Sequence, residues 1–268
     1  MTSLAIYQVD AFADRLFSGN PAAVVPLESW LPDDTLLAIA AENNLSETAF
    51  FVPAGEGAFE LRWFTPTSEV PLCGHATLAT SLVLCERLGA TAQTLRFLTR
   101  FSGDLLVTRR DGLYEMALPR RSFSPVAGDP AVSQALGAEP VESFLVPVPG
   151  DDILMVVLDG WQRVRDLAPD LSAIARLSWR SVLVTAEGGE GCDFVSRYFA
   201  PKFGIPEDPV TGSAHCSLAP LWMEKLGRVE LTARQLSKRG GTVLCRVESE
   251  VVHVAGRGVL FLEGTIRV

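Results

Sequence analysis

A short pattern of residues occurs twice in this chain, with the two copies about half a chain length apart in 268 residues. Each copy has an extended Phe-x-Pro stretch, then a glycine-containing turn, then a nearly all-apolar run that stops at Leu-Gly. The first copy runs from Phe64 through Cys73-Gly74-His75 to Leu88-Gly89, and the second from Phe199 through Thr211-Gly212-Ser213 to Leu226-Gly227. This repetition predicts an internal duplication that folds as two similar halves.

The two glycine turns are predicted to bring a pair of helix N-termini to one site. A helix N-terminus carries N–H groups without intrahelical partners and a partial positive charge, so it can bind carboxylates and stabilise a developing enolate. Small residues such as Ala76 and Ala214 follow the turns and would let a ligand approach the backbone. Either turn alone is also consistent with an ordinary cap on a buried helix. The pairing favours the binding site.

The composition excludes several classes of partner. A hydrophobic content of 48% is enough for a substantial core, whereas a formal charge of −9 and a pI near 4.9 argue against nucleic acids and anionic membranes. The N-terminus lacks the basic and apolar regions of a signal peptide, and no uncharged apolar run reaches transmembrane length. We therefore expect a soluble, cytoplasmic protein.

The cysteines predict neither a disulfide framework nor a structural metal site. The chain has five of them, widely spread, without a Cys-x-x-Cys pair or a neighbouring histidine at zinc-binding spacing. No flavin, nucleotide or pyridoxal signature is present either. We therefore expect a reaction that uses no metal and no cofactor.

Apolar periodicity and turn signals predict a similar order of elements in both halves. The first half should contain strands at 4–10, 22–27, 47–52, 59–64, 95–97, 105–108 and 114–118, with helices at 33–43 and 75–88. The second should contain strands at 153–158, 181–186, 193–199, 243–247, 251–255 and 259–262, with helices at 170–177 and 213–226. Residues 119–150 are rich in Pro and Gly and are interpreted as the crossing between the halves.

The predicted fold class is α/β (α+β), with two pseudo-symmetric halves at residues 1–120 and 121–268. Each half is expected to be a curled β-sheet around a central helix, and the extreme N- or C-terminal strands are allowed to cross between the halves. The run from His75 to Leu88 has little polar face, which is typical of a helix buried on most sides. This layout resembles the diaminopimelate epimerase fold.

The resemblance extends to individual motifs, which occur in order over most of the chain. Together they are similar to the PhzF-like family, named for a phenazine biosynthesis isomerase. The motifs are Val9-Asp10-Ala11-Phe12, Gly19-Asn20-Pro21-Ala22-Ala23-Val24-Val25, Asn44-Leu45-Ser46-Glu47-Thr48-Ala49-Phe50, Phe64-Thr65-Pro66, Leu72-Cys73-Gly74-His75-Ala76-Thr77 and Asp208-Pro209-Val210-Thr211-Gly212-Ser213-Ala214-His215.

The resemblance implies a reaction and roles for particular residues. In the phenazine enzyme the glutamate of the Asn-Leu-Ser-Glu-Thr motif moves a proton along the carbon skeleton of trans-2,3-dihydro-3-hydroxyanthranilate, and the matching residue here is Glu47. His75, Asp208 and Ser213 match family residues that contact substrate or assist proton movement. We therefore predict Glu47, His75 and Asp208 as catalytic, and Ser46, Gly74, Thr211, Gly212 and Ser213 as substrate-binding.

The residues taken alone leave simpler alternatives open. Glu47 would be desolvated at the entrance of an apolar strand, as a proton shuttle requires, but a strand-end glutamate is also commonly solvated. His75 is equally consistent with a capping or core histidine, and Asp208 before Pro209 with a turn residue.

Cys73 raises the alternative of a two-thiol reaction, in which racemases and epimerases of this fold use one thiol on each face of the substrate carbon. Alignment of the two copies puts Thr211 at the second thiol position, and Cys216 follows five residues later. The pattern therefore disfavours a two-thiol mechanism and favours Cys73 as a buried structural residue.

The sequence as a whole predicts a cofactor-independent isomerase of the PhzF-like family that acts on a small carboxylate-bearing substrate, cyclic or an aromatic precursor. A homodimer is implied by the resemblance. The alternatives are an amino-acid racemase or epimerase, and a small-molecule-binding protein that has lost its chemistry. The sequence does not specify the substrate or the pathway, phenazine or other.

Overall fold

The computed structural model describes residues 2–149, 152–189 and 191–268, and its contacts divide the chain into two units. Unit 1 comprises Met1–Ala117 and Ala255–Val268, and unit 2 comprises Leu118–Val254. The composition shift predicts a boundary near residue 120. In the structure the chain leaves unit 1 after Ala117 and returns to it at Ala255, so the last strand completes the unit in which the first begins.

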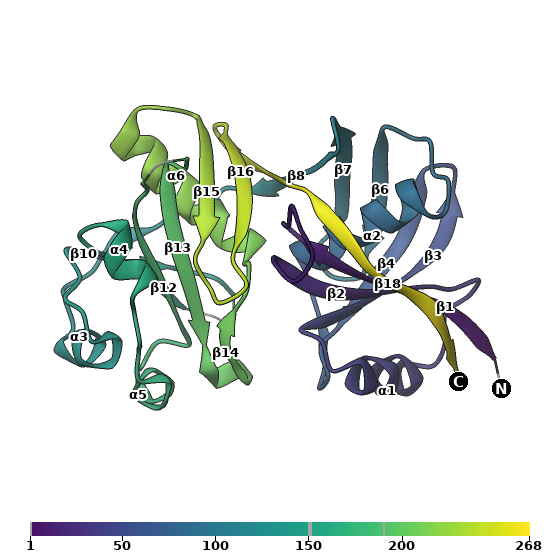
Figure 1. Cartoon of the computed structure of the whole chain (residues 1–268), viewed down its shortest axis with the longest axis horizontal. Coiled ribbons are helices and arrows are strands. Elements are labelled where there is room, and N and C mark those ends of the chain that lie inside the picture. The colour runs from purple at the N-terminus through teal and green to yellow at the C-terminus, as the bar shows by residue number, and fades with distance from the viewer. Residues whose placement is uncertain (1, 150–151, 190) are drawn as a thin grey trace. The chain divides into compact units, whose positions relative to one another are not determined.

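Unit 1 is a sheet of mainly antiparallel strands with two helices (Figure 1). Its elements are β1 (Ser3–Ala11), β2 (Asn20–Pro26), α1 (Asp33–Asn43), β3 (Glu47–Gly55), β4 (Ala58–Phe64), β5 (Glu69–Val70), α2 (Gly74–Glu86), β6 (Thr94–Thr99), β7 (Asp104–Arg110), most of β8 (Leu113–Pro119) and β18 (Gly258–Arg267).

Unit 2 contains the remaining elements, with a long helix and several short ones. They are β9 (Ser124–Pro125), α3 (Pro130–Leu136), β10 (Glu142–Val146), β11 (Ile153–Val157), α4 (Trp161–Arg165), α5 (Leu171–Arg176), β12 (Ser181–Glu187), β13 (Phe194–Ala200), η1 (Pro201–Phe203), β14 (Ile205–Asp208), η2 (Gly212–Ala214), α6 (His215–Leu226), β15 (Glu230–Gln235), β16 (Gly241–Val247) and most of β17 (Val251–Gly256).

Strand pairing follows the same succession in both units. In unit 1 the pairs are β1–β2 antiparallel, β2–β3 parallel, β3–β4 antiparallel, β4–β6 parallel and β6–β7 antiparallel. In unit 2 they are β10–β11 antiparallel, β11–β12 parallel, β12–β13 antiparallel, β13–β15 parallel and β15–β16 antiparallel. Helices connect the parallel pairs, because such pairs need a long crossover. The repeated sequence pattern therefore corresponds to a repeated topology.

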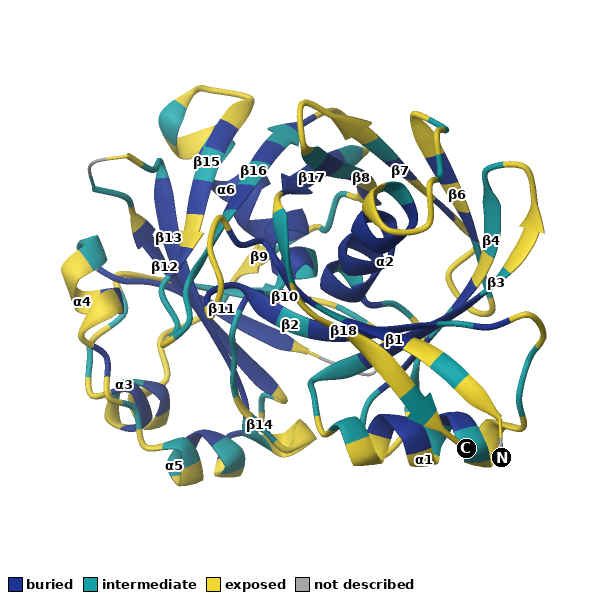
Figure 2. Cartoon of the chain, turned by 45° about the vertical axis from the view of Figure 1, so that its right-hand side comes forward, coloured by how far each residue is buried: buried dark blue, intermediate teal, exposed yellow. Residues whose placement is uncertain are grey.

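The helix α2 is buried along most of its length, as its lack of a polar face predicts (Figure 2). All residues from His75 to Leu84 are buried. Its hydroxyl side chains bond back to carbonyl groups four residues earlier: Thr77 to Cys73 at 2.7 Å, Thr80 to Ala76 at 2.8 Å and Ser81 to Thr77 at 2.9 Å. Polar residues are tolerated inside the sheet because the helix satisfies them itself.

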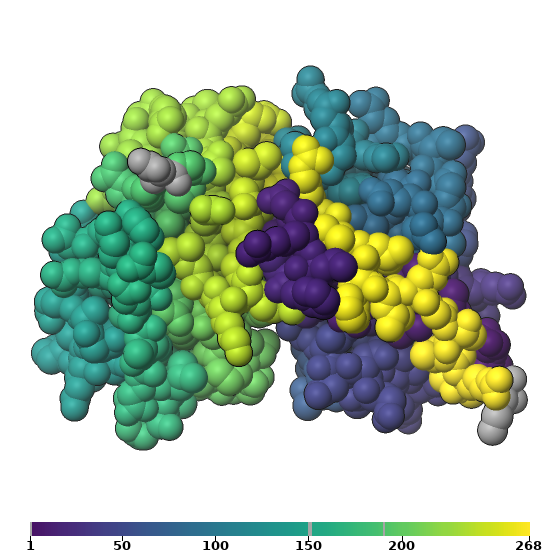
Figure 3. Space-filling view, in the orientation of Figure 1, coloured from purple at the N-terminus to yellow at the C-terminus, as the bar shows by residue number. Residues whose placement is uncertain are grey.

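The C-terminal strand β18 belongs to unit 1, although the sequence before it forms unit 2. It pairs antiparallel with β1, from Ser3 opposite Arg267 to Ala11 opposite Gly258, so the two ends of the chain lie side by side (Figure 3). A Cβ at Gly258 would lie 2.9 Å from Cδ1 of Leu82, which is closer than real Cβ contacts. Any side chain at this position would have to displace the Leu82 methyl group where the strand passes α2.

Residues 119–150 are more structured than a crossing segment. They contain β9, α3 and β10, so the chain forms elements of its own where its composition predicts a crossing between the halves. Local signals for α3 are present: the carboxylate of Asp129 accepts from the Ala131 amide at 2.9 Å, Pro130 begins the helix, and Gly137 ends it in the left-handed region. The helix predicted at 213–226 begins at His215, after the 3₁₀ turn η2. None of the helices described is long and apolar enough to span a bilayer.

The first residue of α6, His215, is fully buried in the core of unit 2. Its Nδ1 donates to the carbonyl of Thr211 at 3.0 Å, while the buried Nε2 has no hydrogen-bond partner among the described residues. Burial lowers the pKa of His215 to about 4, because a second ring proton would lose hydration without gaining an acceptor.

We predict that His215 makes the protein less stable in acid. Between pH 6.5 and about 4 the unfolded chain binds a proton at this residue that the folded chain does not, so stability is retained above pH 6.5 and lost as the pH falls. The loss attributable to His215 should reach roughly 2–3 kcal/mol. Urea unfolding measured between pH 4 and pH 7 should show a smaller pH dependence for His215→Gln, whose amide can still donate to Thr211. An unchanged pH dependence in that variant, with His253→Gln as the control, would refute the assignment.

Candidate functional site

Glu47 is the first residue of β3, as predicted, and so lies where this strand enters the sheet. It pairs with Ala22 of the parallel strand β2, and the apolar residues Ala49 and Phe50 follow it into the core. Its side chain is only 13% exposed. The sequence thus places a carboxylate where a buried strand begins, largely shielded from water.

Cys73 and His75 lie at the N-terminus of α2. Cys73 is the extended residue that precedes the helix, and His75 occupies its first turn. Both are buried, at 6% exposure each. The turn that starts this helix therefore directs a thiol and an imidazole toward the start of β3.

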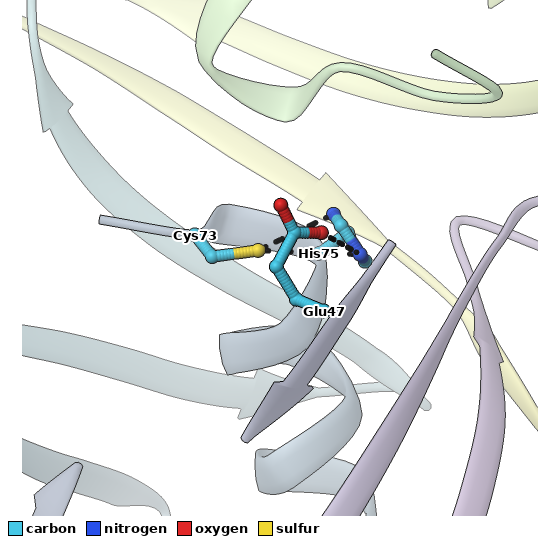
Figure 4. Close-up of side chains that lie close together, drawn as sticks. All are labelled: Glu47, Cys73 and His75. Carbon is cyan, nitrogen blue, oxygen red and sulfur yellow. Dashed lines mark hydrogen bonds and ion pairs between the residues drawn. The ribbon is translucent and has the colours of Figure 1, made fainter. Parts of the chain in front are cut away.

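Glu47, Cys73 and His75 form a tight cluster (Figure 4). Nε2 of His75 lies 3.2 Å from Oε2 of Glu47, and Nδ1 of His75 lies 3.4 Å from Sγ of Cys73. The imidazole thus stands between an acid and a thiol. Oε2 is buried and, although it is at ion-pair distance from the ring, accepts no well-aligned hydrogen bond among the described residues.

The cluster changes the acidity of its members. Burial alone lowers the pKa of His75, but the negative charges available on Cys73 and Glu47 outweigh it, and the pKa rises well above its usual value of 6.5. Burial raises the pKa of the Cys73 thiol to about 11, and the charge of Glu47 adds to this effect. The thiol is therefore neutral at neutral pH, so the charge that then favours a protonated imidazole comes from Glu47.

Asn20 belongs to the same cluster and was not predicted as a site residue. Its Nδ2 lies 3.3 Å from Nδ1 of His75. The preceding Gly19 has a φ of +67°, and a Cβ there would lie 2.2 Å from the carbonyl oxygen of Ala11, so only glycine makes this turn. Asn20 lies in the motif Gly19-Asn20-Pro21, which the sequence analysis identified. Its contact with His75 was not predicted, because the two residues are 55 positions apart in the sequence.

The predicted residues of unit 2 form a separate hydrogen-bonded group. The Thr211 hydroxyl donates to Oδ2 of Asp208 at 2.6 Å. Gln235, which is buried and was not predicted, accepts from the Thr211 amide at 2.8 Å and donates to the Asp208 carbonyl at 2.7 Å. The side-chain amide of Gln235 therefore holds both ends of the turn. Gln235 is the last residue of β15, and no sequence motif there indicates this role.

The remaining predicted residues lie beside these two groups. Ser46 directly precedes Glu47 and is half-buried, and Gly74 is the first residue of α2. Gly212 and Ser213 form the 3₁₀ turn η2, with Gly212 buried and Ser213 half-buried. The structure thus brings Glu47 and His75 into contact in unit 1 and joins Asp208 to Thr211 in unit 2.

The duplication shows which of these positions differ between the units. Glu47 pairs with Ala22 at the start of β3, and Ser181 pairs with Ile153 at the corresponding start of β12. Ser181 is buried and its hydroxyl accepts from Tyr198 at 2.9 Å. In the aligned turns Thr211 replaces Cys73 and Ser213 replaces His75. Unit 1 alone therefore carries the acid, the thiol and the imidazole at these equivalent positions.

The cluster also offers ligands for a metal ion. One ligand atom each from Glu47, Cys73 and His75 lies within 4.8 Å of the others, the one such group of His, Cys, Asp and Glu found in the described part of the chain. Sequence spacing did not reveal it, because the carboxylate comes from a different element than the two residues of α2.

Comparisons with known proteins agree with this architecture. The sequence model of the PhzC-PhzF family, described as phenazine biosynthesis-like protein, matches residues 9–264. An uncharacterized isomerase from Pseudomonas aeruginosa is 49% identical over 265 residues, which cover 99% of each chain. The crystal structure of a PhzF-family phenazine biosynthesis protein from Enterococcus faecalis is 43% identical, with a TM-score of 0.94 and 100% coverage of both chains.

The fold extends beyond these relatives. A hydroxyproline epimerase from Agrobacterium vitis shares it at 11% identity, with a TM-score of 0.60 over 98% of this chain and 92% of that chain. The predicted epimerase-like α/β fold is therefore confirmed. With the family match extending over nearly its whole length, this chain belongs to the phenazine biosynthesis-like (PhzF) protein family.

Proposed function

We propose that this isomerase moves a proton between carbon atoms of a small carboxylate-bearing substrate, without a cofactor, and that Glu47 carries the proton. Membership of the family and its relatives named as isomerases establish the general class of enzyme. The observation that supports the specific mechanism is the contact of 3.2 Å between the buried carboxylate of Glu47 and Nε2 of His75. A buried acid held against an imidazole is a common arrangement for general acid–base catalysis.

In this mechanism Glu47 takes a proton from one carbon of the substrate and returns it to another. The electron pair of the broken C–H bond delocalises into the adjacent unsaturated system, and it forms the new C–H bond when the proton returns. The imidazolium of His75 stabilises the carboxylate before it accepts the proton, and Nε2 can relay a proton to or from Oε2. The side chain of Glu47 remains 13% exposed, so its proton can exchange with solvent before it returns to carbon.

The anionic part of the substrate needs donors, since the chain as a whole is acidic. We propose that backbone amides in the first turn of α2, from Gly74 on, bind a carboxylate or an enolate oxygen, as helix N-termini do. Ser46, Thr211, Gly212 and Ser213 are proposed to bind substrate, and Asp208, which is fixed by Thr211, to orient it. A homodimer remains part of this proposal and is testable by sedimentation.

A two-thiol racemase is less well supported. Cys73 is buried with a neutral thiol at neutral pH, and the equivalent position in unit 2 is Thr211. A thiol pair would require a second cysteine at that position. Glu47 therefore remains the better base.

The identity of the base can be tested by solvent deuterium incorporation. Incubation in D₂O with trans-2,3-dihydro-3-hydroxyanthranilate and a panel of unsaturated cyclic carboxylic acids, followed by mass spectrometry, should reveal turned-over substrates. Glu47→Gln should lower the rate by about 10²–10⁴-fold, the usual contribution of a general acid–base group. Cys73→Ser should have a much smaller effect. If Cys73→Ser abolishes incorporation and Glu47→Gln spares it, the racemase alternative is correct.

Gly74 provides a test of the helix N-terminus as an anion site. A Cβ at Gly74 would meet only Cε of Met116, at an ordinary 3.8 Å, so Gly74→Ala should fold normally and have an unchanged or slightly raised melting temperature. A methyl group there should still obstruct a ligand that approaches the amides and lower kcat/KM by about tenfold or more. Gly264→Ala is a matched control, since its Cβ would meet Leu262 at the same 3.8 Å. Equal kinetics for both variants would contradict this placement of the anion.

Asn20 is predicted to position His75. The side-chain amide of Asn20 can donate a hydrogen bond from Nδ2 to an unprotonated Nδ1 of His75. If the amide is flipped, its oxygen can instead accept a hydrogen bond from a protonated Nδ1. Asn20→Leu should lower kcat/KM by about 10–100-fold, through misplacement of the ring, and shift the ¹⁵N resonances of His75. Because the pKa of His75 is raised, the alkaline limb of the kcat/KM profile should lie well above pH 6.5 in the wild type and move in this variant. Asn20→Asp should restore part of the activity, whereas unchanged resonances in Asn20→Leu would remove Asn20 from the mechanism.

A further inference from the structure

The cluster of Glu47, Cys73 and His75 combines a carboxylate, a thiol and an imidazole in one buried place, which acid–base catalysis by itself does not require. The proposed reaction uses the glutamate and the histidine and leaves the thiol without a task. Carboxylate, thiolate and imidazole are, however, the ligands that Zn²⁺ prefers in proteins. The thiol therefore distinguishes this cluster from an ordinary acid–imidazole pair.

The separations of the ligand atoms are close to those of a tetrahedral zinc site. With Zn–N and Zn–O bonds of about 2.0–2.2 Å and Zn–S bonds of about 2.3 Å, tetrahedral angles put N and O about 3.4 Å apart and N and S about 3.6 Å apart. Here Nε2 of His75 lies 3.2 Å from Oε2 of Glu47 and 4.0 Å from Sγ of Cys73. Sγ lies still closer to Nδ1 of the same ring, at 3.4 Å, so the imidazole must turn about its Cβ–Cγ bond before one nitrogen faces both other ligands.

The surroundings of the cluster also suit an ion. Oε2 of Glu47 is buried and accepts no well-aligned hydrogen bond in the described chain, so a cation would supply a partner that it lacks. Cys73 and His75 are fixed by the first turn of a buried helix, which limits the entropy lost when a metal binds. Three protein ligands leave the fourth tetrahedral position open, as in zinc sites that also bind water or a small anion.

We propose that Glu47, Cys73 and His75 bind one Zn²⁺ ion, and that the zinc-bound protein is inactive. The ion occupies the carboxylate oxygen and the imidazole nitrogen through which the proton would move, and its binding releases to solvent the thiol proton of Cys73 and any proton on the ligating nitrogen of His75. The inhibition rests on the proposed function of Glu47 and His75, whereas the binding does not. Zinc availability would then control the isomerase reversibly through a thiol that takes no part in catalysis.

Binding can be tested with Co²⁺ as a spectroscopic substitute in the full-length protein. Titration of the wild type should give visible d–d bands and a near-ultraviolet thiolate-to-cobalt charge-transfer band that saturate at one ion per chain and disappear when Zn²⁺ displaces the cobalt. Cys85→Ser, a half-buried cysteine of the same helix, should behave like the wild type. Cys73→Ser should lose the charge-transfer band and bind more weakly, by more than the roughly 10–100-fold cost of losing an outer-shell partner.

The outcomes separate the site from the function. The zinc site is refuted if the charge-transfer band is absent from the wild type or persists in Cys73→Ser. Cys73→Ala, with a circular dichroism spectrum of each variant, shows whether a lost band results from misfolding. Glu47→Gln and His75→Asn should each weaken cobalt binding while leaving the thiolate band. Zinc should inhibit deuterium incorporation by the wild type, and a chelator should restore it. Zinc that binds through Cys73 without inhibiting would overturn the inhibition and the role of Glu47, and would leave the metal site in place.

Discussion

The burial of α2 along most of its length is the constraint on which the rest of unit 1 depends. A helix inside a sheet has no water to satisfy its polar groups, and the hydroxyls of Thr77, Thr80 and Ser81 bond to the helix's own backbone instead. The amides of its first turn cannot be satisfied in this way, since they have no preceding turn. The amides of this first turn therefore lie beside Cys73 and His75 without intrahelical partners. The anion site that we propose here would thus depend on the same burial that stabilises the core.

The duplication explains why the candidate chemistry is asymmetric. Both units repeat the same succession of strand pairs, so equivalent positions can be compared directly. Unit 1 has Glu47 where unit 2 has Ser181. The hydroxyl of Ser181 already accepts a hydrogen bond from the hydroxyl of Tyr198. In unit 2 the turn residues bond to one another and to Gln235, which makes that turn rigid. One scaffold therefore holds an acid, a thiol and an imidazole in one copy and a hydrogen-bonded turn in the other.

The Glu47–His75 pair is a poor source of stability. Removing charged groups from water is costly, and a buried ion pair recovers that cost only with good geometry and further hydrogen bonds. Oε2 of Glu47 has the charge of the imidazole nearby but no well-aligned hydrogen bond in the described chain. A buried carboxylate oxygen without a hydrogen bond is expected where a bound ligand or a proton supplies the missing partner. The neighbouring Cys73 adds a soft ligand at the same place, which widens what the cluster can bind.

The local sequence determined the parts of the protein that depend on short-range patterns. Apolar periodicity predicted the buried helix α2, alternation and turns predicted the strand that Glu47 begins, and the repeated Phe-x-Pro and glycine motifs indicated the duplication. The motifs also named the family, and with it Glu47 and His75. The segment 119–150 misled because its prolines and glycines cap a short helix and flank short strands as well as they mark a linker.

Only the tertiary structure decided which distant residues meet. The contact of Asn20 with His75 spans 55 residues, that of Gln235 with Thr211 spans 24, and β18 returns from the end of the chain to pair with β1. Such contacts depend on strand register and on the direction from which each element enters the sheet, which no local pattern encodes. The physical reason is that a side chain's residue type limits what it can bind, whereas the packing of the whole unit decides which partner lies within reach.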